Sequence, residues 1–380
     1  MPLNTAPIKD GYLYIENDGT VIHVNDTPPI TSQFEVEVYK GLVCPGFVNT
    51  HCHLELSHMK NLMPEGTGLP EFVSQIPHKR KESKVQASQA IKDADQNMRK
   101  EGIVAVGDVS NTKDTLKVKK DSAIRYHSFI ELFGLDKRKA HKVFSEGLKM
   151  LESFRASALS ASLAPHAAYS LTPQLLKDIY TASKGQILSI HHQETPSENE
   201  LFLDSKGELY DLFLSKGLDL SSQLERKQSS AQYALMSYLP KEQKLLLVHN
   251  TCSGKDDIEQ IETYFNRAYW CACPKANWFI ERRLPNYNLW RENKLKITIG
   301  TDSLASNNTL SVLEEIKLIQ KKFPHIPTAE LLCWASKNGA EFFGYNDLGS
   351  FKTGSKPGVI LIEEVNDLQL NPNSKVTVLV

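Results

Sequence analysis

The sequence predicts an α/β protein of the (β/α)8-barrel type, because strand-like apolar runs alternate with helical segments along most of the chain. A second observation is that four of these runs are followed, at once or after two residues, by a histidine or an aspartate. In (β/α)-barrel enzymes, the loops that leave the carboxyl ends of the strands converge on one pocket. The chain has 380 residues, of which 41% are hydrophobic. This is ample for a barrel of roughly 250 residues.

Short apolar runs between turn residues mark the expected strands. Near the N-terminus, the runs 12–16 and 21–24 flank an Asn-Asp-Gly turn and predict a hairpin. The run 42–48, interrupted at Pro45-Gly46, predicts a buried strand. Further strands are expected at 103–106, 124–131, 161–164, 187–190, 245–248, 295–299, 357–362 and 376–380.

Helical segments are expected between these strands. Residues 71–100 are polar and mostly helical in pattern, and Glu101-Gly102 ends this segment. Residues 310–322 predict an amphipathic helix, because every third residue from Leu310 to Ile319 is apolar. The lysine-rich stretch 113–120 predicts a solvated helix or loop.

Charge and composition exclude several classes of partner. The formal net charge of -1 provides no long-range field that would attract nucleic acid or an anionic membrane. The sequence contains no run of about 18 apolar residues, so we expect no membrane span. The N-terminus lacks the layout of a secretory signal, and the six cysteines do not form a disulfide framework. We therefore expect a cytoplasmic protein, and a homodimer is left open.

The segment around residue 51 predicts half of a metal site. His51 and His53 follow a buried strand, and alternation along a strand places both side chains on the same face. The other candidate ligands also end apolar runs: they are His191 or its neighbour His192, His249 and Asp302. Four runs ending in such residues are harder to explain by packing than one.

In this order, the motifs resemble the amidohydrolase superfamily, most closely its branch of metal-dependent deaminases and chlorohydrolases that act on purines, pyrimidines and triazines. The resemblance extends from about the first strand to the last fifth of the chain. It rests on P-G-F-V-N-T-H-C-H-L-E-L-S at 45–57, A-P-H-A-A-Y-S at 164–170, H-H-Q-E-T-P-S-E at 191–198, V-H-N-T-C at 248–252, C-P-K-A-N at 273–277 and G-T-D-S-L-A-S-N-N-T-L at 300–310.

The resemblance implies two domains. Residues 43–349 would form the barrel, and residues 1–42 and 350–380 would join into one small β-sandwich. It also implies a ligand set of His51, His53, His191 and Asp302 for one divalent metal ion per chain. Three imidazoles and one carboxylate suit zinc, with iron as the alternative.

Two further patterns bear on this metal site. The H-x-x-E spacing of the deaminase branch selects His191 over His192, which would then point to the other side of its strand. Relatives with two metals use a carboxylated lysine near the fourth strand, and residues 160–169 contain no lysine. One metal is therefore expected.

Catalytic and substrate-binding roles follow from the same resemblance. Asp302 would also accept a proton from the metal-activated water, His249 would orient the resulting hydroxide, and Glu194 would shuttle protons to the substrate. Candidate substrate contacts are His166, Glu55 and Trp278. For His166 the alternative is a capping or loop histidine, for Glu55 a carboxylate in a surface ion pair, and for Trp278 ordinary packing.

The expected activity is hydrolysis of a carbon–nitrogen bond, with deamination of an amino-substituted N-heterocycle. The form H-x-H-L-E-x-S is similar to that of aminodeoxyfutalosine deaminases, which favours a 6-aminopurine nucleoside or derivative as the small-molecule substrate. The alternatives are a guanine- or cytosine-type deaminase and a chlorohydrolase of the same branch. A barrel without catalytic activity that serves as a scaffold is a remote alternative, because such relatives usually lose ligands.

Overall fold

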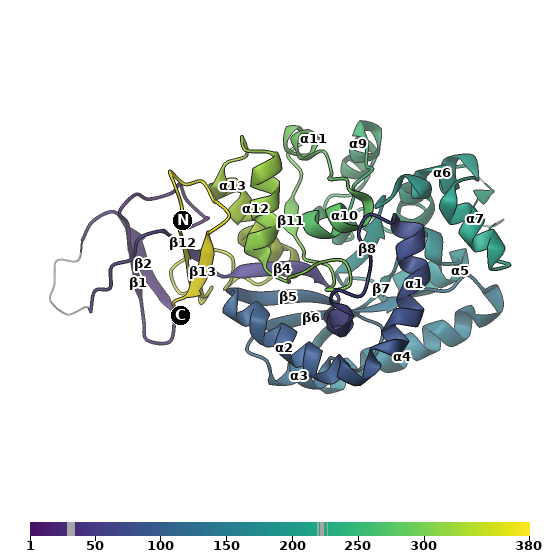
Figure 1. The fold of residues 1–380 in the computed structure, drawn as a ribbon, viewed down its shortest axis with the longest axis horizontal. Coiled ribbons are helices and arrows are strands. Elements are labelled where there is room, and N and C mark those ends of the chain that lie inside the picture. Colours follow the sequence, from purple (N-terminus) through teal and green to yellow (C-terminus); the bar gives the residue numbers. More distant parts are fainter. Residues whose placement is uncertain (29–34, 219, 221–223, 226) are drawn as a thin grey trace.

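A computed structural model of the protein describes residues 1–28, 35–218, 220, 224, 225 and 227–380, and its main body is a (β/α)8 barrel (Figure 1). Within these residues, eight parallel strands form two four-stranded sheets, in the orders β4-β5-β6-β7 and β11-β10-β9-β8. The strands are β4 (Phe47–Cys52), β5 (Ile103–Ser110), β6 (Arg125–Leu132), β7 (Ser160–Pro165), β8 (Leu188–His192), β9 (Leu245–His249), β10 (Ala268–Ala272) and β11 (Ile297–Ile299).

The two sheets meet at two seams, and predicted site residues lie at both of them. At one seam Cys52 bridges Asp302, and the amides of Thr301 and Asp302 donate to the carbonyl of His51. At the other seam Ala167 bridges His191. The seams therefore bring together the ends of β4 and β11, and the ends of β7 and β8.

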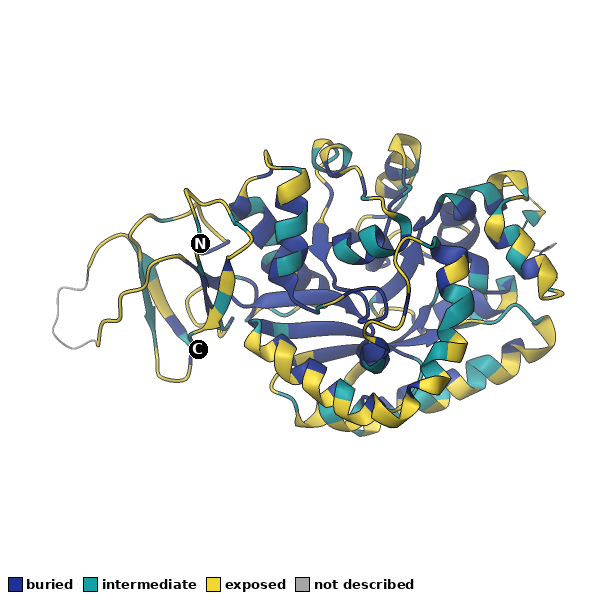
Figure 2. Cartoon of the chain, in the orientation of Figure 1, coloured by how far each residue is buried: buried dark blue, intermediate teal, exposed yellow. Residues whose placement is uncertain are grey.

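Helices surround the strands, with exposed outer faces and buried inner faces (Figure 2). The segment expected at 71–100 is helical but divided into two helices, and the helix expected at 310–322 is present as α12. The helices are α1 (Leu69–Glu82), α2 (Ala87–Lys100), α3 (Leu116–Asp121), α4 (Ala140–Ala156), α5 (Pro173–Ala182), α6 (Pro196–Asp204), α7 (Glu208–Ser215), α9 (Lys255–Tyr264), α10 (Pro274–Glu281), α11 (Tyr287–Glu292), α12 (Val312–Lys322), α13 (Thr328–Leu332) and α14 (Asn338–Phe343). No helix in the described part of the chain is long and apolar enough to cross a membrane.

Both chain ends contribute strands to small antiparallel sheets beside the barrel (Figure 1). The expected hairpin is present as β1 (Tyr12–Ile15) and β2 (Val21–Asn25). A three-stranded antiparallel sheet contains β3 (Leu42–Pro45), β12 (Val359–Glu363) and β13 (Lys375–Val378). Val21 of the hairpin packs in one apolar cluster with Val359 of that sheet, so the two sheets share a core.

The strand expected over 42–48 is in fact two strands in different sheets. β3 pairs with β12 in the terminal sheet, whereas β4 pairs with β5 in the barrel. The chain crosses between the sheets at Pro45-Gly46. A Cβ atom at Gly46 would lie 3.0 Å from the carbonyl oxygen of Pro357 and would clash with Val104. The apolar pattern alone could not show this change of partner.

Lys119 contradicts the expectation of a solvated stretch at 113–120. This residue lies on α3 and is only 2% exposed. Its Nζ lies 2.5 Å from Asp108 Oδ2 and donates to the hydroxyls of Ser110 and Ser128, each at 2.9 Å. These three polar partners on β5 and β6 compensate for the burial of the ammonium group, whereas Lys117 on the same helix is exposed.

Candidate active site

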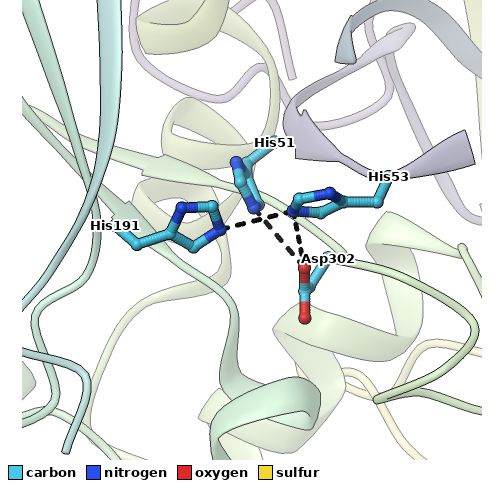
Figure 3. Close-up of side chains that lie close together, drawn as sticks. All are labelled: His51, His53, His191 and Asp302. Carbon is cyan, nitrogen blue, oxygen red and sulfur yellow. Dashed lines mark hydrogen bonds and ion pairs between the residues drawn. The ribbon is translucent and has the colours of Figure 1, made fainter. Parts of the chain in front are cut away.

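Four side chains converge at the carboxyl ends of the barrel strands (Figure 3). His51 and His53 come from the end of β4, His191 from β8, and Asp302 from the turn after β11. Asp302 Oδ1 lies 3.4 Å from Nε2 of both His51 and His53, and the Nε2 atoms of His53 and His191 are 3.3 Å apart. Each of the four residues offers one possible ligand atom, and these four atoms all lie within 4.8 Å of one another. The structure thus brings together all four residues that the sequence predicted as ligands.

The state of these side chains fits a divalent metal ion. Within the described residues, neither ring nitrogen of the buried His51 makes a hydrogen bond, an unfavourable arrangement unless an ion or ligand satisfies these atoms. His191 Nδ1 donates to the carbonyl of His166 at 2.9 Å, which leaves Nε2 free to coordinate. Burial lowers the pKa of both His51 and His191, which favours the neutral rings that bind metals.

The backbone at the site is strained at two positions. His249 and Asp302 both adopt left-handed conformations, with φ of 74° and 55°. A non-glycine residue in this region costs on the order of 1–3 kcal/mol, and such residues cluster at functional sites. Asp302 is also held by the hydroxyl of Ser306, which donates to its second oxygen. The surrounding fold therefore keeps both side chains in an unfavourable but defined position.

Glu194 and His249 form a second pair next to the four ligands. Glu194 Oε1 lies 3.6 Å from His249 Nε2. Burial raises the pKa of Glu194 well above its usual value, with further contributions from nearby carboxylates. His249 Nδ1 donates to Asn277 Oδ1 at 2.7 Å, which fixes the ring and directs Nε2 towards Glu194. Asn277 was not a predicted site residue, although it ends the motif at 273–277.

His192 lies apart from the ligand group. Its neighbour His191 faces the three other ligands, and alternation along β8 turns His192 to the opposite side. There its Nδ1 lies 3.0 Å from Oδ1 of Asn250. The geometry therefore agrees with the choice of His191 as the candidate ligand.

His166 contacts a carboxylate that sequence reasoning missed. Its Nδ1 lies 2.8 Å from Oε1 of Glu131 on β6, and its ring centre is 4.6 Å from that of His191. Burial opposes protonation of His166, but the carboxylate of Glu131 outweighs this effect and raises the pKa of the ring. Glu131 also accepts a hydrogen bond from Asn111. It ends the apolar run 124–131, as the predicted ligands end theirs, and that position was the available signal.

Residues 42–379 match the sequence profile of the amidohydrolase family. The chain belongs to this family. Two curated relatives of this amidohydrolase are an adenosine deaminase of Helicobacter pylori and an aminodeoxyfutalosine deaminase of Nitratiruptor sp. The first is 25% identical over 343 residues and the second 26% over 351. Each match covers 87% of this chain and 82% of the relative.

The fold agrees with that of a solved relative. The structure of Helicobacter pylori aminofutalosine deaminase in complex with methylthio-coformycin has a TM-score of 0.78 to this chain, at 22% sequence identity. The match covers 94% of this amidohydrolase and 87% of the other chain. At this level of identity, the likeness shows a shared barrel architecture.

Two of the predicted substrate-contact residues of this amidohydrolase, Glu55 and Trp278, lie outside the group of candidate ligands. Glu55 is buried, and its carboxylate accepts from Arg80 at 2.8 Å and from the amides of Asn111 and Thr112 at 3.1 and 3.0 Å. Trp278 lies on α10, where the Nζ of Lys322 is 4.1 Å from its ring centre. It lines a cavity of about 670 Å³ that is bordered by none of the four candidate ligands. The structure does not place either side chain in the ligand group.

Proposed function

We propose that this amidohydrolase removes the amino group of a 6-aminopurine nucleoside, or of a derivative such as aminodeoxyfutalosine, by hydrolysis. The observation that carries the proposal is a buried carboxyl group, Glu194, beside His249 and the four candidate ligands. Because its pKa is raised, Glu194 is suited to donate a proton near neutral pH. The deaminase names of the two relatives support the same reaction.

In this proposal, His51, His53, His191 and Asp302 hold one divalent ion, with zinc preferred over iron for three nitrogens and one carboxylate. A bound ion of this kind acts as a Lewis acid and lowers the pKa of a coordinated water from 15.7 to about 7. The unsatisfied nitrogens of His51 are the structural reason to expect an ion at this position.

Residues of the protein then transfer the protons and orient the attacking water. Glu194 donates a proton to the ring nitrogen beside the reacting carbon, while Asp302 accepts one from the attacking water. The imidazole of His249, held by Asn277, orients that water through Nε2. Return of a proton to the amino group lets it leave as ammonia, so one water is consumed and an oxo group replaces the amino group. This chemistry needs an amino group on a C=N unit within a ring.

His166 is the proposed contact for the part of the substrate beyond the ring. Its side chain is 23% exposed, whereas those of Glu131 and His191 beside it are 5% and 8% exposed. A partly open polar group next to a buried site can bind a sugar hydroxyl, which favours a nucleoside over a free base. The proposal also includes a cytoplasmic location, on the grounds of composition.

An ammonia-release screen tests the proposal. Adenosine, 5'-methylthioadenosine and aminodeoxyfutalosine should release ammonia faster than adenine, guanine, cytosine or a linear amide. A parallel chloride assay should find little chloride released from a chlorotriazine. Glu194→Gln should retain its metal and lose roughly 10²-fold in turnover. Glu262→Gln is a matched control: burial also raises the pKa of Glu262, but its carboxylate accepts from the indole of Trp270.

Two results would count against this function. Turnover of linear amides or chlorotriazines alone would exclude a nucleoside deaminase. Loss of the metal in Glu194→Gln would make Glu194 a ligand rather than a proton donor.

A further inference from the structure

Phe133 is an aromatic residue left uncovered at the mouth of the barrel. It follows β6, along which alternate residues face the barrel interior. Phe129 is fully buried in a core cluster there, and Glu131 contacts His166 and His191. Phe133 comes next in this row, yet it is 55% exposed. The ring of Phe129 packs against other core side chains, whereas much of the ring of Phe133 faces solvent.

The backbone around Phe133 is anchored on both sides. The carbonyl of Leu132 accepts from the amide of His166 at 3.0 Å. The amide of Gly134 donates to the carbonyl of Ser170 at 2.8 Å, and its own carbonyl accepts from Thr172 at 3.2 Å. The exposed ring is therefore held on a fixed backbone that is tied to the loop carrying His166.

Phe133 lies farther from the candidate ligands than His166 does. The ring centres of Phe133 and His166 are 6.1 Å apart, and those of His166 and His191 are 4.6 Å apart. In a bound substrate whose reacting carbon lies near the ligand group, the part next to the ring would therefore lie beside His166, and the part farther from the ring would lie beside Phe133. A phenyl ring offers apolar and stacking contacts but no hydrogen bond.

We infer that Phe133 is a specificity-determining residue whose ring packs against an apolar or aryl group carried on the sugar of the nucleoside. This inference rests on the proposed function. A group attached at the sugar carbon remote from the base is the part of the substrate farthest from the departing ammonia. Phe133 would thus select among nucleosides without touching the reacting atoms.

The test compares substrates that differ only in this group. KM and kcat are measured for adenosine and for 5'-deoxy-5'-phenylthioadenosine with wild-type protein, Phe133→Ala and Phe133→Leu. Phe133→Ala should raise KM for the phenylthio compound about tenfold, whereas KM for adenosine and both kcat values change little. Phe133→Leu should fall between wild type and Phe133→Ala. Val378→Ala, at a side chain 44% exposed on β13 of the terminal sheet, is the control and should change neither KM.

Each other outcome contradicts the inference. Equal changes of KM for both substrates would mean that Phe133 does not contact the group that distinguishes them. An altered oligomeric state in light scattering, with an unchanged ratio of KM values, would make the ring an interface between copies of the chain. Both results leave the deaminase function standing, provided that the wild type turns over adenosine. Absence of ammonia release from every nucleoside would overturn both proposals.

Discussion

Replacing Lys119 with methionine should destabilise the protein strongly, whereas the same change at Lys117 should have little effect. The two lysines lie on α3, two residues apart. The Lys119 side chain is 0% exposed and pairs with Asp108, whose side chain is also 0% exposed. The Lys117 side chain is 86% exposed and pairs with Asp121 at the surface. Surface pairs of this kind contribute little because water and salt screen them.

The expected magnitude follows from what the substitution leaves behind. Methionine fills nearly the same space as lysine, so little cavity forms. The carboxylate of Asp108 remains buried, and among the described residues it still accepts from the amide of Leu54 at 2.7 Å and from the hydroxyl of Ser110 at 3.3 Å. Removing one partner of a buried ion pair costs about 3–5 kcal/mol. That is a large share of the total stability of about 5–15 kcal/mol typical of folded proteins.

Urea unfolding of the metal-loaded protein measures this difference. Lys119→Met should lower the unfolding midpoint at an unchanged slope, and Lys117→Met should match the wild type. Adding Asp108→Asn should recover part of the loss, because the amide carries no charge and its oxygen still accepts from Leu54. Since Leu54 follows His53, Lys119→Met should also lose metal faster in competition with a chelator.

The reasoning fails if Lys119→Met is as stable as Lys117→Met, because the buried pair would then contribute nothing. It also fails if Asp108→Asn adds further destabilisation to Lys119→Met. In that case, an unpaired carboxylate would not be the cause of the loss.

Elemental analysis should find about one equivalent of zinc or iron per chain; two tightly bound metals would contradict a single site. His191→Ala should lose this metal and His192→Ala should keep it, because only the first faces the other ligands. Burial lowers the pKa of His127 to about 3 from its usual 6.5. Its contribution to stability is therefore complete above pH 6.5 and is lost as the pH falls towards 3. About 2 kcal/mol should be lost by pH 5, and His127→Gln should remove this part of the pH dependence in urea unfolding.

Much of the fold and of the candidate site followed from local patterns. The spacing of His51 and His53 by two residues places both on one face of β4, wherever that strand lies in the protein. The apolar runs before His191 and Asp302 indicated strands whose carboxyl ends share one side of a barrel. Residues at such ends converge for geometric reasons, so the sequence could predict their meeting without a contact map.

Contacts between distant segments were decided only by the tertiary structure. The sequence could not show that β3 pairs with β12 while β4 pairs with β5, because both strands have the same apolar pattern. Nor could it show that Lys119 is buried, or that Glu131 contacts His166.

The physical reason is the same in each case. A local pattern determines which face of its own element a side chain occupies. Whether a charged group on that face meets water or an opposite charge depends on which strand or helix packs against it.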